Sequence, residues 1–188
     1  KEHSGAYGRR EKSGQPQRKS TQAYERGTEK AMKVLIVSDT HRKNDNYFKV
    51  AALVKPDLVL HCGDAEGSEY VLTRVVDCPV QIVLGNNDFL SCLPGELELK
   101  LGAYKVWVTH GHNYYVSMGN EVIKREAAAR GMDIVIYGHT HKPVVDTKGS
   151  VIAVNPGSLS YPRQEGRRPS YIVMEVEDED LRFSIEYL

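Results

Sequence analysis

The chain of 188 residues has few cysteines and no long apolar stretch. No apolar run approaches the ~18 residues that a membrane-spanning helix requires, so the sequence predicts no such span. Its three cysteines form no C-x-x-C pair, and one is left over under any pairing. Neither a G-x-S-x-G elbow nor a P-loop occurs, which removes two alternative chemistries. With no secretory signal pattern in the sequence, we expect a cytoplasmic protein with reduced thiols.

Net charge is zero overall but is unevenly distributed. Residues 1–31 contain eight Lys/Arg and four Glu, a balance of +4, so residues 32–188 have a balance of −4. Because the first segment lacks apolar periodicity, we expect a disordered basic tail, natural or added, over 1–31 and a single domain over 32–188. The tail could also be a basic arm that contacts RNA or an acidic partner, although its composition does not favour this. The acidic remainder gives no strong nucleic-acid signal.

Strand and helix patterns alternate at the start of the domain. The sequence predicts a β-α-β-α-β order over Lys33–Val37, Asn44–Val54, Leu58–Leu60, Ser68–Val76 and Val80–Leu84. A strand-rich half follows, with a helix over Asn120–Arg130, a buried strand over Ile134–Tyr137 and hairpins turning at 102–103, 148–149 and 177–180. This order predicts an α/β fold in which two mixed sheets pack face to face with helices outside them, a four-layer α/β/β/α sandwich.

Six of the seven histidines lie in short loops that follow apolar runs. Four loops, 38–41, 61–64, 109–112 and 138–141, hold these histidines, and a fifth loop, 85–88, follows another apolar run; three of the five loops, 38–41, 61–64 and 85–88, carry Asp or Asn. Ligands of open α/β sheets gather at the carboxyl ends of the strands, so we expect the five loops to converge on one site. His61 ends an apolar run, and we interpret it as a structural residue or a neighbour of the ligands.

Imidazole, carboxylate and amide groups are the ligands that divalent metals prefer. The candidate metal ligands are Asp39, His41, Asp64, Asn86, His110, His139 and His141. Seven ligands with one bridging carboxylate, Asp64, give four to each of two ions. Two such ions would hold a bridging hydroxide and clamp a phosphate for in-line attack, with no side-chain nucleophile required. The sequence therefore predicts a two-metal hydrolase.

The ordered motifs D-x-H, G-D, G-N, H-G-H and G-H-T-H resemble those of the calcineurin-like metallophosphoesterase superfamily. The segment Asn155–Ser158 and the short length are similar to its small YfcE-like phosphodiesterase branch. The resemblance implies a sandwich fold and phosphodiesterase activity. It assigns Asp39, His41, Asp64 and His141 to one ion, and Asp64, Asn86, His110 and His139 to the other. It also implies manganese first, with nickel, zinc or iron as alternatives, and suggests a homodimer.

One position departs from the superfamily pattern. Many members have His directly after the motif Asn, where it assists the leaving group, whereas this chain has Asn87. An amide can orient a phosphate oxygen but cannot act as a general acid, so we expect activated aryl diesters to be better substrates than alkyl diesters. His112 could replace that acid or support a ligand. Arg163, in the polar segment after Gly157, is a candidate phosphate contact or an ordinary surface residue.

The main alternative function is a non-catalytic protein-interaction scaffold. The retromer subunit of eukaryotic membrane trafficking resembles this fold and is thought to act through its surface. Non-catalytic proteins of this kind have usually lost some of the metal-binding residues, whereas all seven positions here hold side chains that can bind a metal. RNA processing is less favoured because the domain is acidic. The expected partner is a small phosphate-ester substrate whose identity the sequence does not specify.

Overall fold

The computed structural model describes residues 21–24 and 31–188 and contains two sheets, each with parallel and antiparallel pairs. The five-stranded sheet has the order β11-β10-β2-β3-β4. In it, β2, β3 and β4 run parallel, whereas β10 and β11 are antiparallel neighbours at one edge. The strand bounds are Met32–Val37 for β2, Leu58–His61 for β3, Val80–Ile82 for β4, Ser170–Glu177 for β10 and Asp180–Tyr187 for β11.

The six-stranded sheet has the order β1-β5-β6-β7-β9-β8. Parallel pairing joins β6 to β7 and β7 to β9, and antiparallel pairing joins β5 to β6 and β8 to β9. The strand bounds are Gln22–Tyr24 for β1, Glu96–Leu101 for β5, Tyr104–Thr109 for β6, Ile134–Ile136 for β7, Pro143–Asp146 for β8 and Ile152–Pro156 for β9. The mixed sheets predicted from the sequence are confirmed.

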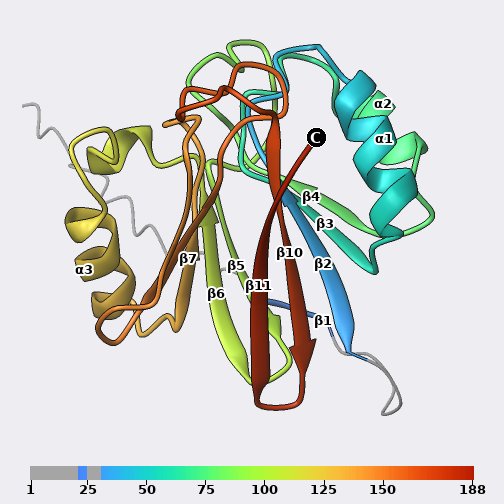
Figure 1. Ribbon diagram of the computed structural model, residues 1–188. Helices are drawn as coiled ribbons and strands as arrows, with labels where there is room; N and C mark the ends of the chain where they lie inside the picture. Colours follow the sequence, from blue (N-terminus) through green and yellow to red (C-terminus); the bar gives the residue numbers. More distant parts are fainter. Residues whose placement is uncertain (1–20, 25–30) are drawn as a thin grey trace, which may run out of the picture.

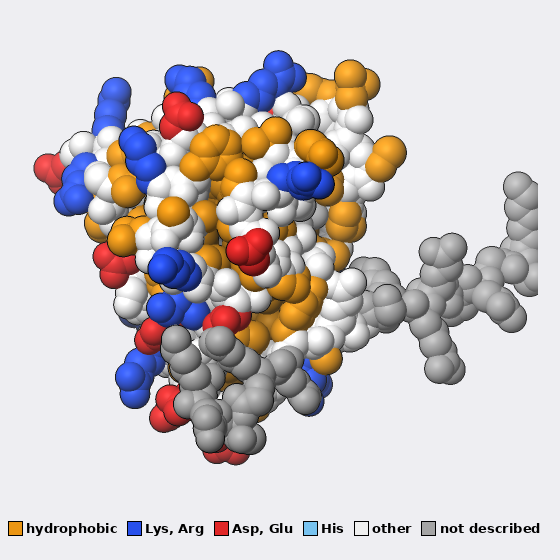
Figure 2. All heavy atoms as spheres, turned by 90° about the vertical axis from the view of Figure 1, so that its right-hand side faces the viewer, with side chains coloured by type: hydrophobic (Ala, Val, Ile, Leu, Met, Phe, Trp, Pro, Cys, Tyr) orange, Lys and Arg blue, Asp and Glu red, His pale blue; other side chains and the backbone are white. Residues whose placement is uncertain are grey.

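Helices cover the outer face of each sheet (Figure 1). Helices α1 (Asp45–Val54) and α2 (Glu69–Arg74) lie on the five-stranded sheet, and α3 (Glu121–Ala129) lies on the six-stranded sheet. Figure 2 looks onto the face with α1 and α2, where hydrophobic side chains lie between charged ones of both signs. The four-layer α/β/β/α sandwich expected from the sequence is therefore the fold of the chain.

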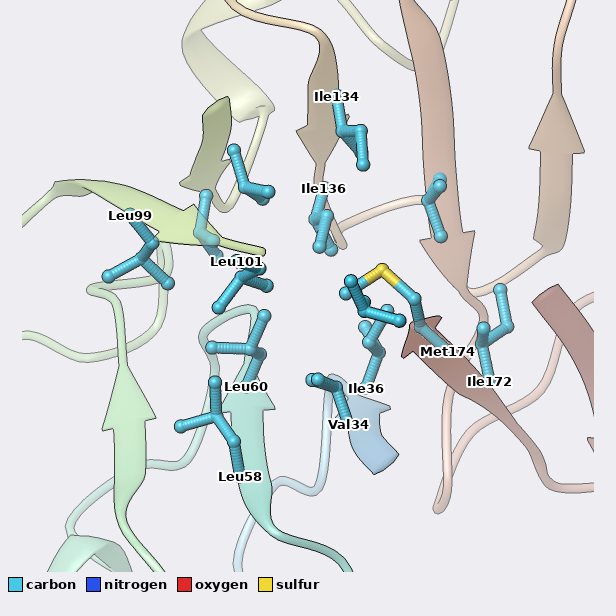
Figure 3. Packing of buried hydrophobic residues seen from close by; sticks show 14 of the residues in the cluster. Val34, Ile36, Leu58, Leu60, Leu99, Leu101, Ile134, Ile136, Ile172 and Met174 are labelled. Atoms are coloured by element: carbon cyan, nitrogen blue, oxygen red, sulfur yellow. The ribbon is translucent and has the colours of Figure 1, made fainter. Parts of the chain in front are cut away.

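Alternating side chains divide the core into layers, because successive residues of a strand point to opposite faces. Val34 and Ile36 of β2 point between the sheets and belong to the same buried cluster as Leu99 and Ile136 of the other sheet (Figure 3). Leu35 faces α1 and α2 instead. Buried on both faces, β2 reads as one continuous apolar run, as the sequence suggested.

Strand β1 corrects the expectation of disorder for Gln22–Tyr24, three residues of the segment 1–31. Gln22–Tyr24 pairs in parallel with the edge strand β5, from Gln22 opposite Leu99 to Tyr24 opposite Leu101. The Tyr24 ring packs against the core between the sheets, and its hydroxyl accepts a hydrogen bond of 2.6 Å from Gln81 Nε2 of β4. A polar segment is thus ordered by pairing with an open edge, which local composition does not reveal. Residues 1–20 and 25–30 of the expected tail lie outside the described residues.

The expected elements of the domain are all present, with boundaries that shift by one or two residues. The second helix shows this, because Glu69–Arg74 is shorter than the expected 68–76. Among the described residues, no helix has the length and apolar character needed to cross a bilayer.

Candidate metal centre

The predicted ligands come from loops that follow strands of both sheets. Asp39, Asp64 and Asn86 follow β2, β3 and β4 of the five-stranded sheet, whereas the three histidines His110, His139 and His141 follow β6 and β7 of the six-stranded sheet. The loops after β2, β3, β6 and β7 gather at one end of the sandwich (Figure 1). The expectation that separate strand ends deliver these residues to one place follows from the parallel pairing within each sheet.

One group of donor atoms is built from Asp39, His41 and His141. Asp39 Oδ1 lies 3.0 Å from His141 Nε2 and 3.8 Å from His41 Nε2. Asp39 is fully buried, and Ser38 Oγ donates a hydrogen bond of 2.5 Å to its other oxygen, Oδ2. The backbone N–H of His139 also donates to Oδ2, at 3.2 Å. Oδ2 is therefore held by the protein, while Oδ1 faces the two imidazoles.

A second group is built around the side-chain oxygen of Asn86. Asn86 Oδ1 lies 3.0 Å from His110 Nε2 and 2.9 Å from His139 Nδ1. Asp64 Oδ2 lies 3.6 Å from His110 Nε2 and 3.8 Å from His41 Nε2, so this one oxygen is near both groups. Donor atoms of Asp39, Asp64 and His110 also lie within 4.8 Å of one another. The structure thus brings all seven predicted ligands together.

Hydrogen bonds fix the ring orientation of three of the histidines that are candidate ligands. His41 Nδ1 donates to Glu66 Oε1 at 2.6 Å. His110 Nδ1 donates to the carbonyl of Cys62, and His141 Nδ1 donates to the carbonyl of Tyr161, both at 2.7 Å. When one ring nitrogen carries the donated proton, the other has a free lone pair, so each of these rings turns Nε2 toward the carboxylates.

The backbone at the ligands is left-handed at five positions. The φ values are +54° at Asp39, +44° at His41, +60° at Asp64, +69° at His139 and +57° at His141. Non-glycine residues rarely adopt this conformation, and such residues cluster at functional sites where the surrounding structure holds them.

Two glycines allow the close approach of the loops that carry these ligands. A Cβ on Gly85 would lie 2.1 Å from Asp64 Oδ1, and one on Gly138 would lie 2.1 Å from Ser38 Oγ. Both distances are far inside van der Waals contact. Any side chain at Gly85 or Gly138 would therefore displace the carboxylate of Asp64 or the hydroxyl that holds Asp39.

Asp88 is a supporting residue that the sequence interpretation missed. Its Oδ2 accepts hydrogen bonds from the backbone N–H of Asp64 at 2.8 Å and of Gly85 at 2.7 Å. Its Oδ1 accepts from the N–H of Glu66 at 2.6 Å. Asp88 is 4% exposed, so one buried carboxylate fastens the Asp64 loop to the loop that carries Asn86. In the sequence, its position two residues after the candidate ligand Asn86 could have indicated a role at the site.

Asn155, at the end of β9, and Ser158, in the segment after β9, support the site. Asn155 Nδ2 donates to the carbonyl of Gly138 at 2.7 Å and to Thr140 Oγ1 at 3.1 Å. Ser158 Oγ donates to the backbone carbonyl of Asp39 at 2.9 Å. These side chains fix the backbone on both sides of the Asp39–His141 contact, which explains why polar residues are buried there.

Burial and neighbouring charges shift the pKa values at the site in different directions. Burial would raise the pKa of Asp39, but the His141 contact and the positive potential of His110 outweigh it and lower the pKa. Burial would lower the pKa of His141, yet the adjacent Asp39 carboxylate raises it. For His139, burial and then the charge of His110 lower the pKa. The cluster therefore stabilises positive charge beside Asp39 and neutral imidazole at His139.

The donor set fits a divalent cation. Asp39 Oδ1 is buried and accepts no hydrogen bond from any residue in the described part of the chain. With its Nδ1 proton donated to Tyr161, neutral His141 presents a bare Nε2 lone pair to this oxygen. Two electron-rich atoms 3.0 Å apart are favourable only with a positive charge between or on them, supplied by a proton or a metal ion.

The other predicted residues occupy different places. His61 is not available as a ligand, because Gly63 N donates to its Nδ1 at 3.2 Å and its Nε2 donates to Thr40 Oγ1 at 3.0 Å. Burial lowers its pKa to about 4, so it is neutral, as expected of a structural histidine. Asn87 donates to both oxygens of Asp64, from Nδ2 at 2.6 Å and from its backbone N at 2.8 Å.

His112 and Arg163 lie beside the ligands. The His112 ring centroid is 5.4 Å from that of His110, and its Nδ1 is buried with no hydrogen-bond partner among the described residues. Arg163 lines a cavity together with His41 and His141, and its backbone N–H donates to the carbonyl of His141 at 3.0 Å. The structure therefore places both residues near the centre, His112 through ring contacts with His110 and His139 and Arg163 through its backbone hydrogen bond to His141.

Comparison with known families agrees with this geometry. The model of the calcineurin-like phosphoesterase superfamily domain matches residues 32–179. Since the match spans most of the chain, the chain belongs to the calcineurin-like phosphoesterase superfamily. The probable metallophosphoesterase YsnB of Bacillus subtilis is 32% identical over 150 residues, covering 79% of this chain and 86% of that protein. The phosphodiesterase YfcE of Escherichia coli is 35% identical over 66 residues, covering 35% of this chain and 32% of YfcE.

Solved structures show the same fold. A predicted phosphoesterase from Streptococcus pneumoniae superposes with a TM-score of 0.73 at 28% identity, covering 84% of this chain and 90% of that one. Vps29 from Entamoeba histolytica, solved in complex with zinc, superposes with a TM-score of 0.69 at 23% identity, covering 84% and 98%. The second likeness concerns the fold alone. The family resemblance expected from the sequence motifs is confirmed.

Proposed function

We propose that the chain is a metal-dependent phosphodiesterase with two divalent ions. One ion would be held by Asp39, His41, Asp64 and His141, and the other by Asp64, Asn86, His110 and His139. The main support is the position of Asp64 Oδ2, which lies 3.8 Å from His41 Nε2 and 3.6 Å from His110 Nε2. A carboxylate near both imidazole groups is suited to bridge two cations.

The cations, when bound, supply nucleophilic water at neutral pH and offset the charge that builds on the phosphate oxygens. In the reaction, water adds to phosphorus, the bond from phosphorus to one ester oxygen breaks, and the released alcohol takes up a proton. The residues of the chain orient this chemistry. Glu66 and the carbonyls of Cys62 and Tyr161 keep three imidazoles turned inward, and Asn87 holds the Asp64 carboxylate through two hydrogen bonds.

The identity of the leaving group should matter because Asn87 cannot act as a general acid. Its side-chain amide already donates to Asp64 Oδ2, and an amide has no proton of suitable pKa for an alkoxide. His112 is the nearby imidazole that could protonate a leaving group. We therefore expect faster hydrolysis of aryl diesters, whose leaving groups need no acid, than of alkyl diesters.

Ligands of mixed nitrogen and oxygen type accept several first-row metals. We propose manganese as the working metal, with nickel, zinc or iron as alternatives. The substrate is a small phosphate ester, and a homodimer and a cytoplasmic location stay predictions.

The proposal is tested with bis(4-nitrophenyl) phosphate and measured metal content. We expect manganese to stimulate hydrolysis, and Asp64→Asn to lower kcat/KM at least 100-fold and to reduce bound metal. Asp77→Asn is the matched control, because Asp77 is an exposed aspartate outside the site. If the chain binds no divalent metal, or if Asp64→Asn retains full activity, the proposal is wrong.

A non-catalytic scaffold on the same fold is the alternative that the Vps29 likeness leaves open. That likeness shows the fold alone. All seven ligand positions of this chain hold competent side chains that converge, which favours catalysis. A metal-loaded protein that hydrolyses no aryl phosphodiester would support the scaffold instead.

A further inference from the structure

A cavity opens directly beside one group of metal-ligand candidates. It has a volume of about 550 Å³ and is lined by His41, Glu66, His141, Tyr161, Pro162, Arg163 and Arg167. Cavities of 300–1,000 Å³ suit small organic ligands, so this space exceeds what the reacting phosphate alone needs. Two histidines of the candidate metal centre form part of its wall. A substrate phosphate at the centre would therefore extend one of its ester groups into this cavity.

The outer wall of the cavity is positively charged. Among the described residues, the arginines that form ion pairs are Arg42 and Arg130, whereas Arg163 and Arg167 form none. By contrast, Arg168 lies over the Tyr187 ring, 5.2 Å from its centroid, and does not line the cavity. Lys43 Nζ lies 4.3 Å from the centroid of the Tyr161 ring, which forms the same wall.

The one carboxylate in the wall, Glu66, is engaged elsewhere. Its Oε1 accepts the 2.6 Å hydrogen bond from His41, and its Oε2 lies 3.8 Å from Arg42 Nε. Two arginines without anionic partners therefore face a space that adjoins the site of reaction. Guanidinium groups bind phosphate and carboxylate through paired N–H donors, so an anionic group is the ligand that this wall suits.

The segment that carries these arginines is tied to the metal centre. Arg163 N donates to the carbonyl of His141 at 3.0 Å, and Ser160 Oγ donates to the carbonyl of Thr40 at 2.7 Å. Arg167 N donates to the carbonyl of Gln164 at 3.0 Å, which closes a turn in which Arg167 has a φ of +45°. The guanidinium groups are thus attached to a backbone whose position depends on His141 and on the Asp39 loop.

A neighbouring cavity is less suited to an anionic group of the substrate than the cavity at Arg163 and Arg167. It has a volume of about 610 Å³ and also touches Glu66, but its wall includes Phe89, Leu90 and Leu93, and its one arginine, Arg42, is already bound to Glu66. Phe89 and Leu90 are 83% and 101% exposed. An anionic group is better accommodated against the two arginines than against these apolar side chains.

Building on the phosphodiesterase function proposed above, we propose that the cavity at Arg163 and Arg167 binds a second anionic group of the substrate. The preferred substrate is then a phosphodiester in which one ester group carries an additional phosphate or carboxylate. The scissile phosphate lies at the metal centre, and the second anion pairs with the two guanidinium groups.

The test compares three diesters that share the 4-nitrophenyl leaving group. The first is ethyl 4-nitrophenyl phosphate, and in the other two the ethyl group ends in a phosphate or a carboxylate. With the manganese-loaded chain, we expect kcat/KM to be about tenfold higher for at least one charged ester, through a lower KM. Whichever charged ester is preferred identifies the anion. The preference should weaken as salt is raised, because the arginines are exposed.

Variants assign the preference to the cavity. In the double variant Arg163→Gln/Arg167→Gln, the ratio between charged and uncharged esters should fall to about one. Arg125→Gln is the matched control, because Arg125 is an exposed arginine of α3 on the other outer face. Equal rates on all three esters, or a preference that persists in the double variant, would overturn the assignment while leaving the phosphodiesterase function standing.

A binding measurement separates the two proposals further. Inorganic pyrophosphate is titrated calorimetrically into the metal-free wild type, the double variant and Arg125→Gln. We expect the wild type and Arg125→Gln to bind with similar affinity and the double variant to bind about tenfold more weakly. That result would support the anion cavity even if no ester were hydrolysed, whereas equal binding by all three proteins would refute it.

Discussion

Replacement of Asp88 tests whether hydrogen bonding by the protein, rather than a metal ion, organises the loops of the centre. The Asp88 carboxylate accepts three backbone N–H groups, from Asp64, Glu66 and Gly85, at 2.6–2.8 Å. Hydrogen bonds to a charged acceptor contribute about 1.5–3 kcal/mol each, although such contributions are not additive. We therefore expect Asp88→Ala to lower the free energy of unfolding of the metal-free chain by about 4 kcal/mol.

The conservative variant Asp88→Asn gives a graded result. The single oxygen of the amide can still accept hydrogen bonds from the N–H groups of Asp64 and Gly85. The NH₂ group would then face the N–H of Glu66, which places two donors against each other. We expect a loss of about 2 kcal/mol, roughly half that of the alanine variant. Because domains are stable by only about 5–15 kcal/mol, this variant keeps the test informative if Asp88→Ala does not fold.

Urea unfolding of the metal-free protein provides the assay. With an m-value of about 2 kcal/mol/M, Asp88→Ala should lower the midpoint by about 2 M and Asp88→Asn by about 1 M. The exposed Asp77, changed to Ala as a control, should shift stability by less than about 0.5 kcal/mol. Metal affinity of Asp88→Asn should also fall at least tenfold, because Asp64 and Asn86 flank the contact. An Asp88→Ala midpoint within error of the wild type would refute this reasoning.

Two further predictions concern histidines. Glu66→Gln should weaken metal binding about tenfold. The Glu66 carboxylate, 2.6 Å from His41 Nδ1, fixes the orientation of the His41 ring and raises its basicity, and an amide does this less well. Titration calorimetry with Mn²⁺ would measure the affinity, and an unchanged affinity would count against this prediction. Burial lowers the pKa of His61 to about 4, below the ordinary value of 6.5. Between those pH values His61 is therefore protonated in the unfolded chain but neutral in the folded chain. Stability from this group is therefore lost as pH falls from 6.5 to 4, by up to about 3 kcal/mol. Urea midpoints of the metal-free wild type and His61→Asn across this range should show a shallower slope for the variant, and parallel slopes would contradict the assignment.

The sequence predicted most of the fold and the metal-ligand candidates for a shared reason. Each candidate follows an apolar run, and parallel strands bring their carboxyl ends to one edge, so strand order and loop position together locate the site. Asp39 and Asp64 could be found in this way because their loops begin directly after β2 and β3.

The residues that support the ligands could not be found from the sequence in the same way. Glu66 acts through one hydrogen bond and Asp88 through three, all of which depend on how two loops meet, and an acidic residue in a loop has no distinctive local pattern. Strand β1 was missed for a related reason. Gln22–Tyr24 contains no apolar run and is ordered by pairing with the open edge of β5. Local patterns reveal burial and periodicity, but contacts between distant loops require the structure.

The left-handed backbone at five candidate ligands shows what the supporting contacts achieve. An aspartate or histidine with positive φ is disfavoured in an isolated loop, so such a loop would not present Asp39 or His141 in the observed orientation without restraint. The restraints lie in the structure, because Asn155 binds the backbone of the G-H-T-H loop and Ser158 binds the carbonyl of Asp39. The backbone that carries the donor atoms is thus held by buried hydrogen bonds from residues outside the candidate ligand set. Metal affinity in this chain should consequently depend on residues that never touch the metal.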